Sequence, residues 1–172
     1  IVGAHIPVAA GAAMKVKYKE EDAVVLCFFG DGAVHQGSFH ETLNMASVWK
    51  LPVIYICENN QYGMGTDFRR VSSVTDFSKM APSYNITGRK IDGMDVLNVY
   101  ENIKEAVEDV KENSRPWLFD VRTYRYLGHS MSDPAKYRSK DELEQKKQDD
   151  PITVFQSALA QNRIISKEQY EK

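Results

Sequence analysis

Residues 24–32 read VVLCFFGDG, so six consecutive apolar residues lead into a Gly-Asp-Gly turn. A short, continuous apolar run that ends in a turn is typical of a strand that a parallel sheet buries on both faces. The pattern returns at residues 53–57, which read VIYIC. Between these strands, residues 38–50 have a helical apolar face, which carries Phe39, Leu43, Ala46 and Trp49. The three segments predict a β-α-β unit.

The alternation of strands and helices continues on both sides of this unit. Helical patterns fall at residues 4–18, 95–112 and from 139 onward, with a break at Asp150–Pro151. Further strands are predicted at residues 87–91 and 117–124. Residues 58–86 are expected to form a long loop region with one helical turn, because Asn, Gly and Pro interrupt them. We predict an α/β fold with a doubly wound, mostly parallel sheet flanked by helices, C-terminal helices, and residues 1–172 as one domain.

The composition excludes several classes of protein. The 172 residues are 42% hydrophobic and 27% charged, which is unlike collagen or a disordered chain. The net charge of -2 gives no field for nucleic acid or a membrane, and we expect neither as a partner. Cys27 and Cys57 lie in apolar runs, which favours buried free thiols in a reducing compartment. Because the chain lacks an initiator Met and stops in a charged helical pattern, we interpret it as an excerpt of a longer polypeptide.

The carboxyl ends of the first two predicted strands carry Asp31 and the pair Asn59–Asn60. Ligands of doubly wound sheets bind in the crevice beyond these ends. If the two strands are neighbours, a carboxylate and a carboxamide oxygen converge there, and such hard oxygen donors suit a Mg²⁺ ion that also binds phosphate. Taken singly, each element is better explained by local structure, as a tight turn at Asp31–Gly32 or an Asx turn at Asn59–Asn60. Their occurrence together favours a metal-bridged diphosphate site.

Other phosphate, metal and catalytic motifs are missing from the sequence. It contains neither the GxxxxGK[ST] motif of P-loop proteins nor a GxGxxG motif after a strand. The four histidines and two cysteines show no zinc-ligand spacing. The GxSxG turn of serine hydrolases is also missing. The site after the first two strands is therefore the best candidate.

The spacing of the two polar turns resembles a cofactor motif. Gly30–Asp31–Gly32, 26 intervening residues and Asn59–Asn60 are similar to the thiamine-diphosphate motif. Over nearly its whole length the chain resembles the α subunits of the first component of 2-oxo acid dehydrogenase complexes, most closely the heterotetrameric pyruvate dehydrogenases. The other matching stretches are IVGA at 1–4, NMA at 44–46, WKLP at 49–52, CENN at 57–60, YGMGT at 62–66, DGMD at 92–95, TYRY at 123–126 and GHSMSDP at 128–134.

This resemblance implies a metal site and a diphosphate site. The side chains of Asp31 and Asn60 and the main-chain carbonyl of Tyr62 would bind Mg²⁺. The backbone N–H groups of Gly32 and Ala33 would hold the diphosphate of thiamine diphosphate. One carboxylate with neutral oxygens is consistent with Mg²⁺, which completes its coordination with phosphate oxygens and water.

The resemblance also implies roles near the reacting end of the cofactor. Val2 would contact the aminopyrimidine ring, and Met64 would lie close to the cofactor-binding loop. Residues 125–138 would form an active-site loop in which His129 binds the cofactor and acts in catalysis. Ser130 matches a serine that mitochondrial relatives phosphorylate to switch the enzyme off. A phosphate there would place negative charge beside the cofactor diphosphate.

The implied reaction is the Mg²⁺- and thiamine-diphosphate-dependent oxidative decarboxylation of pyruvate, with acetyl transfer to the lipoyl group of the acyltransferase component. The implied assembly is a heterotetramer of two α and two β chains. Because the β subunit supplies the glutamate that activates the aminopyrimidine, we expect this chain alone to be inactive. Acetoin and branched-chain 2-oxo acid complexes stay open as alternatives, as does a non-catalytic α/β module that binds a Mg-phosphate ligand.

The loop sequence also bears on the source of the chain. Lys136 stands where mitochondrial forms carry a second serine, which favours a bacterial or plastid-like origin. We expect a bacterial cytoplasmic location, with the plastid stroma and the mitochondrial matrix as alternatives.

Overall fold

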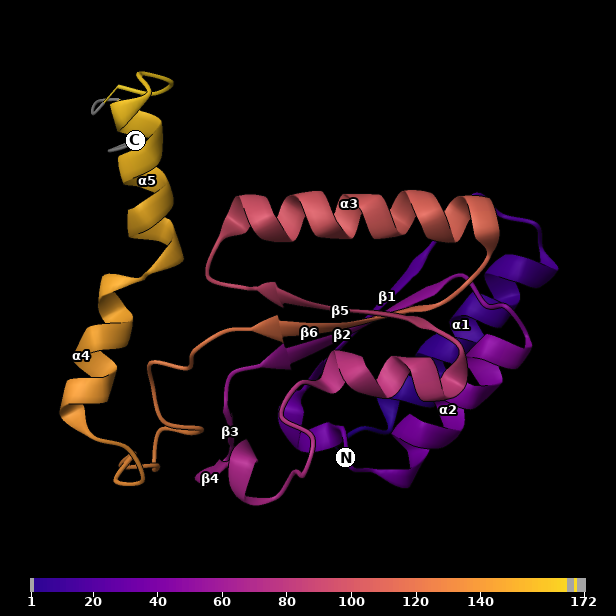
Figure 1. The fold of residues 1–172 in the computed structure, drawn as a ribbon, viewed down its shortest axis with the longest axis horizontal. Coiled ribbons are helices and arrows are strands. Elements are labelled where there is room, and N and C mark those ends of the chain that lie inside the picture. The colour runs from indigo at the N-terminus through magenta and orange to yellow at the C-terminus, as the bar shows by residue number, and fades with distance from the viewer. Residues whose placement is uncertain (1, 167–168, 170–172) are drawn as a thin grey trace.

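The computed structural model describes residues 2–166 and 169, and it is built on a four-stranded parallel sheet (Figure 1). In spatial order the strands are β1 (Val25–Gly30), β2 (Val53–Asn59), β6 (Trp117–Arg122) and β5 (Thr87–Asp92). Each neighbouring pair is parallel. The predicted parallel sheet is confirmed, and the first two predicted strands lie side by side. Ile1, the first residue of the matching stretch at 1–4, lies outside the described residues.

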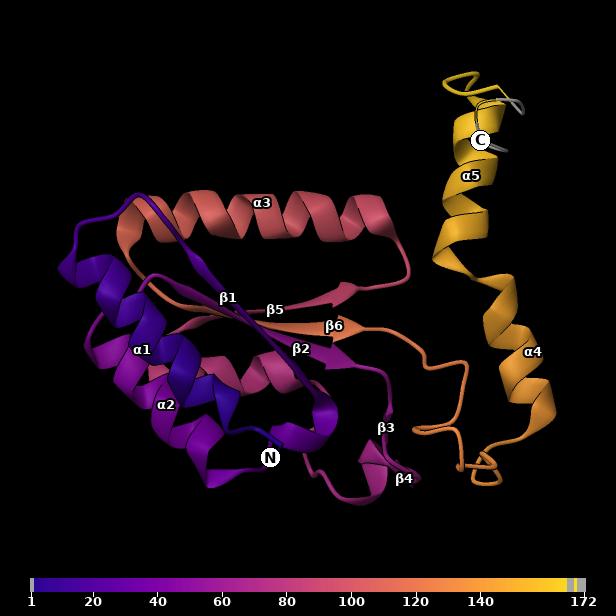
Figure 2. The same ribbon diagram turned by 180° about the vertical axis from the view of Figure 1, so that it is seen from behind.

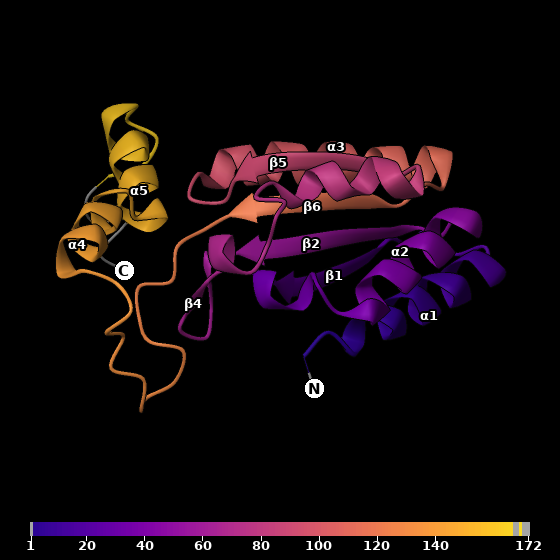
Figure 3. The same cartoon turned by 60° about the horizontal axis from the view of Figure 1, so that its bottom comes forward.

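Helices cover both faces of the sheet. α1 (His5–Tyr18) and α2 (Gly37–Val48) lie on one face and α3 (Val96–Asn113) lies on the other, as Figures 1 and 2 show from opposite sides. α4 (Lys140–Gln148) and α5 (Pro151–Gln161) lie beyond the carboxyl ends of the strands (Figure 3), and none of the residues that the structure describes in them is buried. The predicted doubly wound arrangement and C-terminal helices are confirmed.

β2 shows why the central strands are continuously apolar. Val53, Tyr55 and Cys57 join the core under α1 and α2, whereas Ile54 and Ile56 join the core under α3. Successive side chains of a strand point to opposite faces, so a strand covered on both faces needs apolar residues at every position. All five residues are at most 5% exposed.

β1 contradicts the prediction of burial on both faces. Cys27 and Phe29 are buried in the core under α1 and α2, but Leu26 is 42% exposed and Phe28 is 57% exposed. β1 is an edge strand, and the core under α3 draws its buried strand residues from β2, β6 and β5. The outer face of β1 therefore lacks a cover within the described part of the chain. An apolar cavity of about 590 Å³ lies beside Phe28.

Two further expectations are wrong in detail. Trp49 was expected on the buried face of α2, but it follows the last helical residue and is 42% exposed. Residues 58–86 contain more structure than a loop with one helical turn. They form the antiparallel pair β3 (Tyr62–Gly63) and β4 (Thr66–Asp67), followed by the 3₁₀ helices η2 (Phe68–Arg70) and η3 (Phe77–Tyr84). Such short elements have too few residues to show an apolar period.

The starts of two helices follow from capping residues. Asp95 accepts hydrogen bonds from the N–H groups of Leu97 and Asn98 at 2.9 and 3.2 Å, and so begins α3. Asp150 caps α5, in which Pro151 is the first residue. Both caps satisfy backbone donors that a helix start leaves free. The predicted break at Asp150–Pro151 is confirmed.

The two thiols are buried and free, as predicted. Burial raises the pKa of Cys27 to about 11, because a thiolate loses its hydration in the core. Within the described residues, each helix is too short or too polar to cross a lipid bilayer.

Candidate cofactor site

A cavity of about 420 Å³ lies where β1 and β2 end. It is lined by Val2, Gly30, Asp31, Gly32, Ala33, Gln36, Asn60, Tyr62, Gly63, Met64, Arg125 and His129. All eight residues to which the sequence analysis gave a metal, cofactor or catalytic role are among them. They come from four separate segments: the N-terminal turn, η1 (Asp31–Ala33), the turn after β2, and the loop after β6.

The turns after β1 and β2 converge because these strands are paired in register. Gly30 pairs with Glu58, so Asp31 and the turn after β2 leave the sheet at the same edge. Beyond the strands the two backbones come into contact, since a Cβ atom built on Gly32 would lie 3.7 Å from the Cα atom of Gly63. Glycine at both positions lets the backbone approach a bulky anion closely.

Asp31 is the carboxylate of this cavity. It is only 4% exposed, and this burial raises the pKa of its carboxyl group. The rise is partly offset by the backbone N–H of Asp31, the charge of Arg125 and the N–H of Asn60, each of which lowers the pKa. A bound cation would stabilise a carboxylate in this position. Among the described residues, no three His, Cys, Asp or Glu side chains gather as a metal cage. One carboxylate beside neutral oxygen donors fits Mg²⁺, which accepts few protein ligands and keeps ligand phosphates and water.

The turn after β2 brings two neutral oxygen donors to the cavity. The Oδ1 atom of Asn60 accepts a hydrogen bond from the N–H of Tyr62 at 3.2 Å. Gln61, between them, has a φ of 75°, in the left-handed region that residues other than glycine rarely adopt. The N–H of Gln61 donates to the Oδ1 atom of Asn59 at 3.3 Å. Side-chain hydrogen bonds on both sides of Gln61 thus stabilise the turn.

Arg125, which from the sequence could either pair with an acid such as Asp133 to order the loops or contact a lipoyl domain, lines the cavity. Its guanidinium donates to the carbonyls of Tyr62, at 3.2 Å, and Met64, and to the hydroxyl of Tyr137 at 2.9 Å. It therefore joins the turn after β2 to the loop after β6. A carbonyl oxygen has two lone pairs, so the Tyr62 carbonyl can still accept a metal ion. The sequence signal was weak, because an arginine in a polar loop is usually solvated.

The predicted active-site loop is held by a hydrogen-bond network around Asp133. This carboxylate accepts hydrogen bonds from the N–H groups of His129 and Ala135 and from the hydroxyl of Tyr137, each at 2.8 Å. The backbone N–H groups of His129 and then Ala135 are the main causes that lower the pKa of Asp133. The Nδ1 atom of His129 lies 3.5 Å from the Nη1 atom of Arg125. The network fixes the backbone that carries His129.

Five of the predicted residues are exposed: Val2, Gly32, Met64, His129 and Ser130. Val2 is 68% exposed and Met64 is 65% exposed, so the cavity opens to solvent on an apolar side. Ser130 follows His129, and its Oγ atom lies 3.1 Å from that of Ser132. Ser130 does not line the cavity, but the loop around it does.

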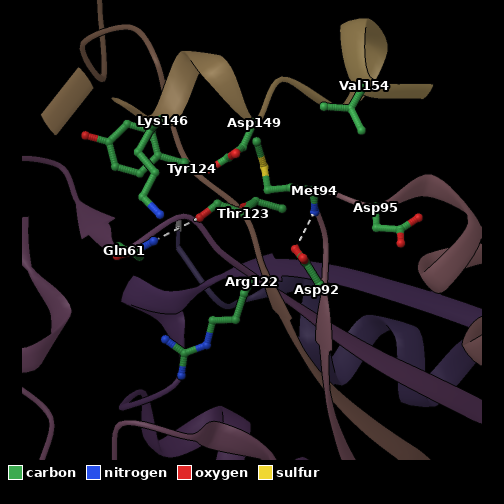
Figure 4. Close-up of a pocket in the computed structure, with 10 residues that line it drawn as sticks. All are labelled: Gln61, Asp92, Met94, Asp95, Arg122, Thr123, Tyr124, Lys146, Asp149 and Val154. Carbon is green, nitrogen blue, oxygen red and sulfur yellow. Dashed lines mark hydrogen bonds between the residues drawn. The ribbon is translucent and has the colours of Figure 1, made fainter. Parts of the chain in front are cut away.

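A second, polar cavity of about 370 Å³ lies at the ends of β5 and β6 (Figure 4). Its polar groups already serve the local fold. Asp92 accepts a hydrogen bond from the N–H of Met94 at 2.9 Å, and Gln61 Nε2 donates to the carbonyl of Thr123 at 3.3 Å. The guanidinium of Arg122 points away from the other side chains that Figure 4 draws. None of the eight predicted residues lines this second cavity.

The comparison with known proteins gives the family. The family model described as "Dehydrogenase E1 component" matches residues 1–172. The chain belongs to this E1 component family.

The pyruvate dehydrogenase E1 component subunit alpha of Rickettsia conorii is 47% identical over 166 residues, which cover 96% of this chain and 51% of the relative. The protein of the same name from Rhizobium meliloti is 49% identical over 160 residues, covering 92% and 46%. The mitochondrial form from Sminthopsis macroura is 43% identical over 174 residues, covering 100% and 47%.

The chain spans about half the length of these curated relatives. A solved structure from Mycobacterium smegmatis, provisionally assigned as a thiamin diphosphate-dependent enzyme, is similar with a TM-score of 0.55. It is 21% identical, and the match covers 73% of this chain and 23% of that chain. At this identity the likeness concerns the fold. The family resemblance inferred from the sequence motifs is confirmed by the E1 component match.

Proposed function

We propose that this chain forms the metal- and diphosphate-binding half of a thiamine-diphosphate-dependent pyruvate dehydrogenase E1 component. The observation that carries the proposal is one cavity in which Asp31, Asn60 and Tyr62 lie beside the backbone of Gly32 and Ala33. Membership of the E1 component family and the names of the relatives support pyruvate as the substrate.

In this proposal the turns after β1 and β2 together bind the metal ion and the diphosphate. The carboxylate of Asp31, the side-chain oxygen of Asn60 and the carbonyl of Tyr62 hold Mg²⁺, and the N–H groups of Gly32 and Ala33 hold the diphosphate. When bound, thiamine diphosphate supplies the carbanion chemistry that decarboxylates a 2-oxo acid. The paired strands behind the two turns keep these groups in place.

In the same proposal, residues of the loop after β6 and of the open side of the cavity lie at the reacting end of the cofactor. His129 holds or moves a proton there and assists acetyl transfer to the lipoyl group, while Val2 contacts the aminopyrimidine ring and Met64 lies close to the cofactor-binding loop. Ser130 is the proposed regulatory phosphorylation site. A phosphate on it adds about two negative charges next to Ser132 and Asp133, whose hydrogen bonds hold the loop.

The proposed partners are a β subunit, in a heterotetramer of two α and two β chains, and the lipoyl domain of the acyltransferase. The exposed Val2 and Met64 support a β subunit that covers the open side of the cavity and supplies the activating glutamate. We place the protein in a bacterial cytoplasm, since R. conorii and R. meliloti provide close relatives. Cell fractionation tests that location.

A titration tests the proposed function. The full-length polypeptide, purified with its β subunit and freed of cofactor, is titrated with thiamine diphosphate in the presence of Mg²⁺. We expect Mg²⁺-dependent binding heat that Asp31→Asn removes. The matched control is Asp22→Asn, because that carboxylate is 84% exposed and pairs with Lys111 on the surface.

Turnover then identifies the substrate. Pyruvate, acetoin and a branched-chain 2-oxo acid are compared with a lipoyl domain as acceptor, and we expect pyruvate to react fastest. Binding heat without turnover of any of the three would indicate a non-catalytic Mg-phosphate module. The proposal is wrong if the wild-type complex gives no binding heat.

A further inference from the structure

Asp120 is a buried carboxylate that does not line the candidate site. It is 0% exposed, in the middle of β6. Its Oδ2 atom accepts hydrogen bonds from the Nη2 atom of Arg122 at 2.8 Å and the N–H of Phe77 at 2.9 Å. Its Oδ1 atom accepts a hydrogen bond from the Nδ2 atom of Asn59 at 3.0 Å. Burying a charge is costly unless such donors satisfy it, and here one oxygen is committed to Asn59.

Asn59 transmits this contact to the turn after β2. Because its NH₂ group donates to Asp120, its Oδ1 atom must face the other way, where it accepts the N–H of Gln61 at 3.3 Å. Asn59 is itself 0% exposed, so its amide depends on these protein partners and not on solvent. The next N–H, that of Tyr62, donates to the Oδ1 atom of Asn60. A continuous series of hydrogen bonds thus leads from Asp120 to the turn that carries both neutral metal donors.

We propose that Asp120 is a positioning residue for the metal site: its carboxylate sets the orientation of the Asn59 amide, and this amide holds the turn that presents Asn60 and Tyr62. The inference rests on the proposed function, because it concerns the same metal ion. Residues that orient metal ligands in this way typically change metal affinity by about 10- to 100-fold when they are mutated.

The variant Asp120→Asn breaks the match of donors and acceptors with almost no change in volume. The new amide keeps its oxygen toward Phe77 and Arg122, so its NH₂ group faces the NH₂ group of Asn59. If Asn59 turns over to relieve this conflict, its NH₂ group then faces the N–H of Gln61. In the first case the NH₂ group of Asn59 loses its acceptor, and in the second case the N–H of Gln61 loses its acceptor, so the support of the turn is weakened either way.

The double variant Asn59→Asp with Asp120→Asn restores the match. The new carboxylate at position 59 accepts hydrogen bonds from both the amide at position 120 and the N–H of Gln61. The net charge of the pair equals that of the wild type. A matched control is Asp109→Asn, since the Asp109 carboxylate likewise accepts side-chain hydrogen bonds, from Trp117 at 2.6 Å and Asn113 at 2.7 Å, but lies on α3.

Two readouts are made on the full-length chain in its complex with the β subunit. The first is Mg²⁺ affinity at saturating thiamine diphosphate, and the second is hydrogen exchange of the Gln61 and Tyr62 amides without ligand. For Asp120→Asn we expect affinity to fall about 10- to 100-fold and both amides to exchange faster. The double variant should return both readouts close to wild type, and Asp109→Asn should leave them unchanged.

Contrary outcomes separate this inference from the proposed function. Unchanged affinity in Asp120→Asn, or a loss that the double variant does not restore, overturns the positioning role while the wild type still binds Mg²⁺. If Asp120→Asn does not fold, the double variant decides by itself, because wild-type exchange at Gln61 and wild-type affinity are required of it. A wild type that binds no Mg²⁺ refutes both proposals.

Discussion

Replacing Gly32 with alanine should leave the fold intact. Among the described residues, the one atom that a Cβ atom on Gly32 meets within 4 Å is the Cα atom of Gly63, at the ordinary van der Waals distance of 3.7 Å. Gly32 also lies outside the left-handed region, which Gly3 occupies with a φ of 81°. Because alanine restricts the unfolded chain, the free energy of unfolding should rise by about 0.4–1 kcal/mol.

The same variant should bind the cofactor less tightly. The added methyl group would stand between the turns after β1 and β2, where the backbone of Gly32 faces the cavity. A diphosphate held there would lose at least one hydrogen bond to a charged group, which contributes about 1.5–3 kcal/mol. The dissociation constant should therefore increase about 10- to 150-fold.

Urea unfolding and calorimetric titration of the full-length complex measure the two effects separately. Gly88→Ala is the contrasting variant, because its Cβ atom would lie 2.2 Å from the carbonyl oxygen of Ser78 and 2.7 Å from the Cβ atom of Ala81. Such a clash should cost about 3 kcal/mol or more of stability. The reasoning fails if Gly32→Ala is as unstable as Gly88→Ala, or if it binds the cofactor as tightly as the wild type.

Asp31→Asn should raise the melting temperature of the cofactor-free protein at pH 7. Burial raises the pKa of Asp31 in the folded protein above its ordinary value of 3.8, so keeping this carboxyl group ionised at neutral pH destabilises the fold, and the variant removes that charge. The gain should shrink as the pH falls toward 4, and a less stable variant at pH 7 would contradict the burial argument. His129→Ala should leave the cofactor affinity within about twofold and slow acetyl transfer about 10²- to 10⁴-fold, and an unchanged overall rate would remove its catalytic role. Ser130→Glu should slow turnover and speed hydrogen exchange around Asp133, and full activity would argue against regulation at this loop. The thiol of Cys27, with a pKa of about 11, should resist iodoacetamide at pH 8 until urea is added, and mass spectrometry of the folded protein should show no label there.

The sequence was sufficient to predict the strands and helices with a clear apolar pattern. β2 is apolar at every position from Val53 to Cys57, and α3 begins at a clear cap, Asp95. The sequence could not show that β1 lies at the edge of the sheet, since Leu26 and Phe28 are as apolar as the residues of β2. Their exposure depends on the order of the strands, which is a property of the whole sheet.

Some residues of the candidate site could also be predicted from the sequence, and others could not. Asp31 and Asn60 could be predicted because each directly follows a strand, and parallel neighbours end at the same edge. The contacts of Arg125 and Asp120 could not, because their partners come from distant parts of the chain. Asp120, for example, joins Asn59, the last residue of β2, to Phe77 of η3, and a single acid within an apolar strand gives no sign of either partner.

Purified alone and concentrated, this chain should self-associate through β1. The Phe28 carbonyl of that strand lies 2.8 Å from the Nε2 atom of His5, but the rest of its outer edge can pair with an extended peptide, and neither lysine nor proline interrupts Val25–Gly30 to block such strand addition. Leu26 and Phe28 add an apolar surface to the same edge. Asp31 directly follows this strand, so misassembly there would also distort the carboxylate of the candidate metal site. Whatever segment or subunit shields the edge thus protects solubility and cofactor binding together.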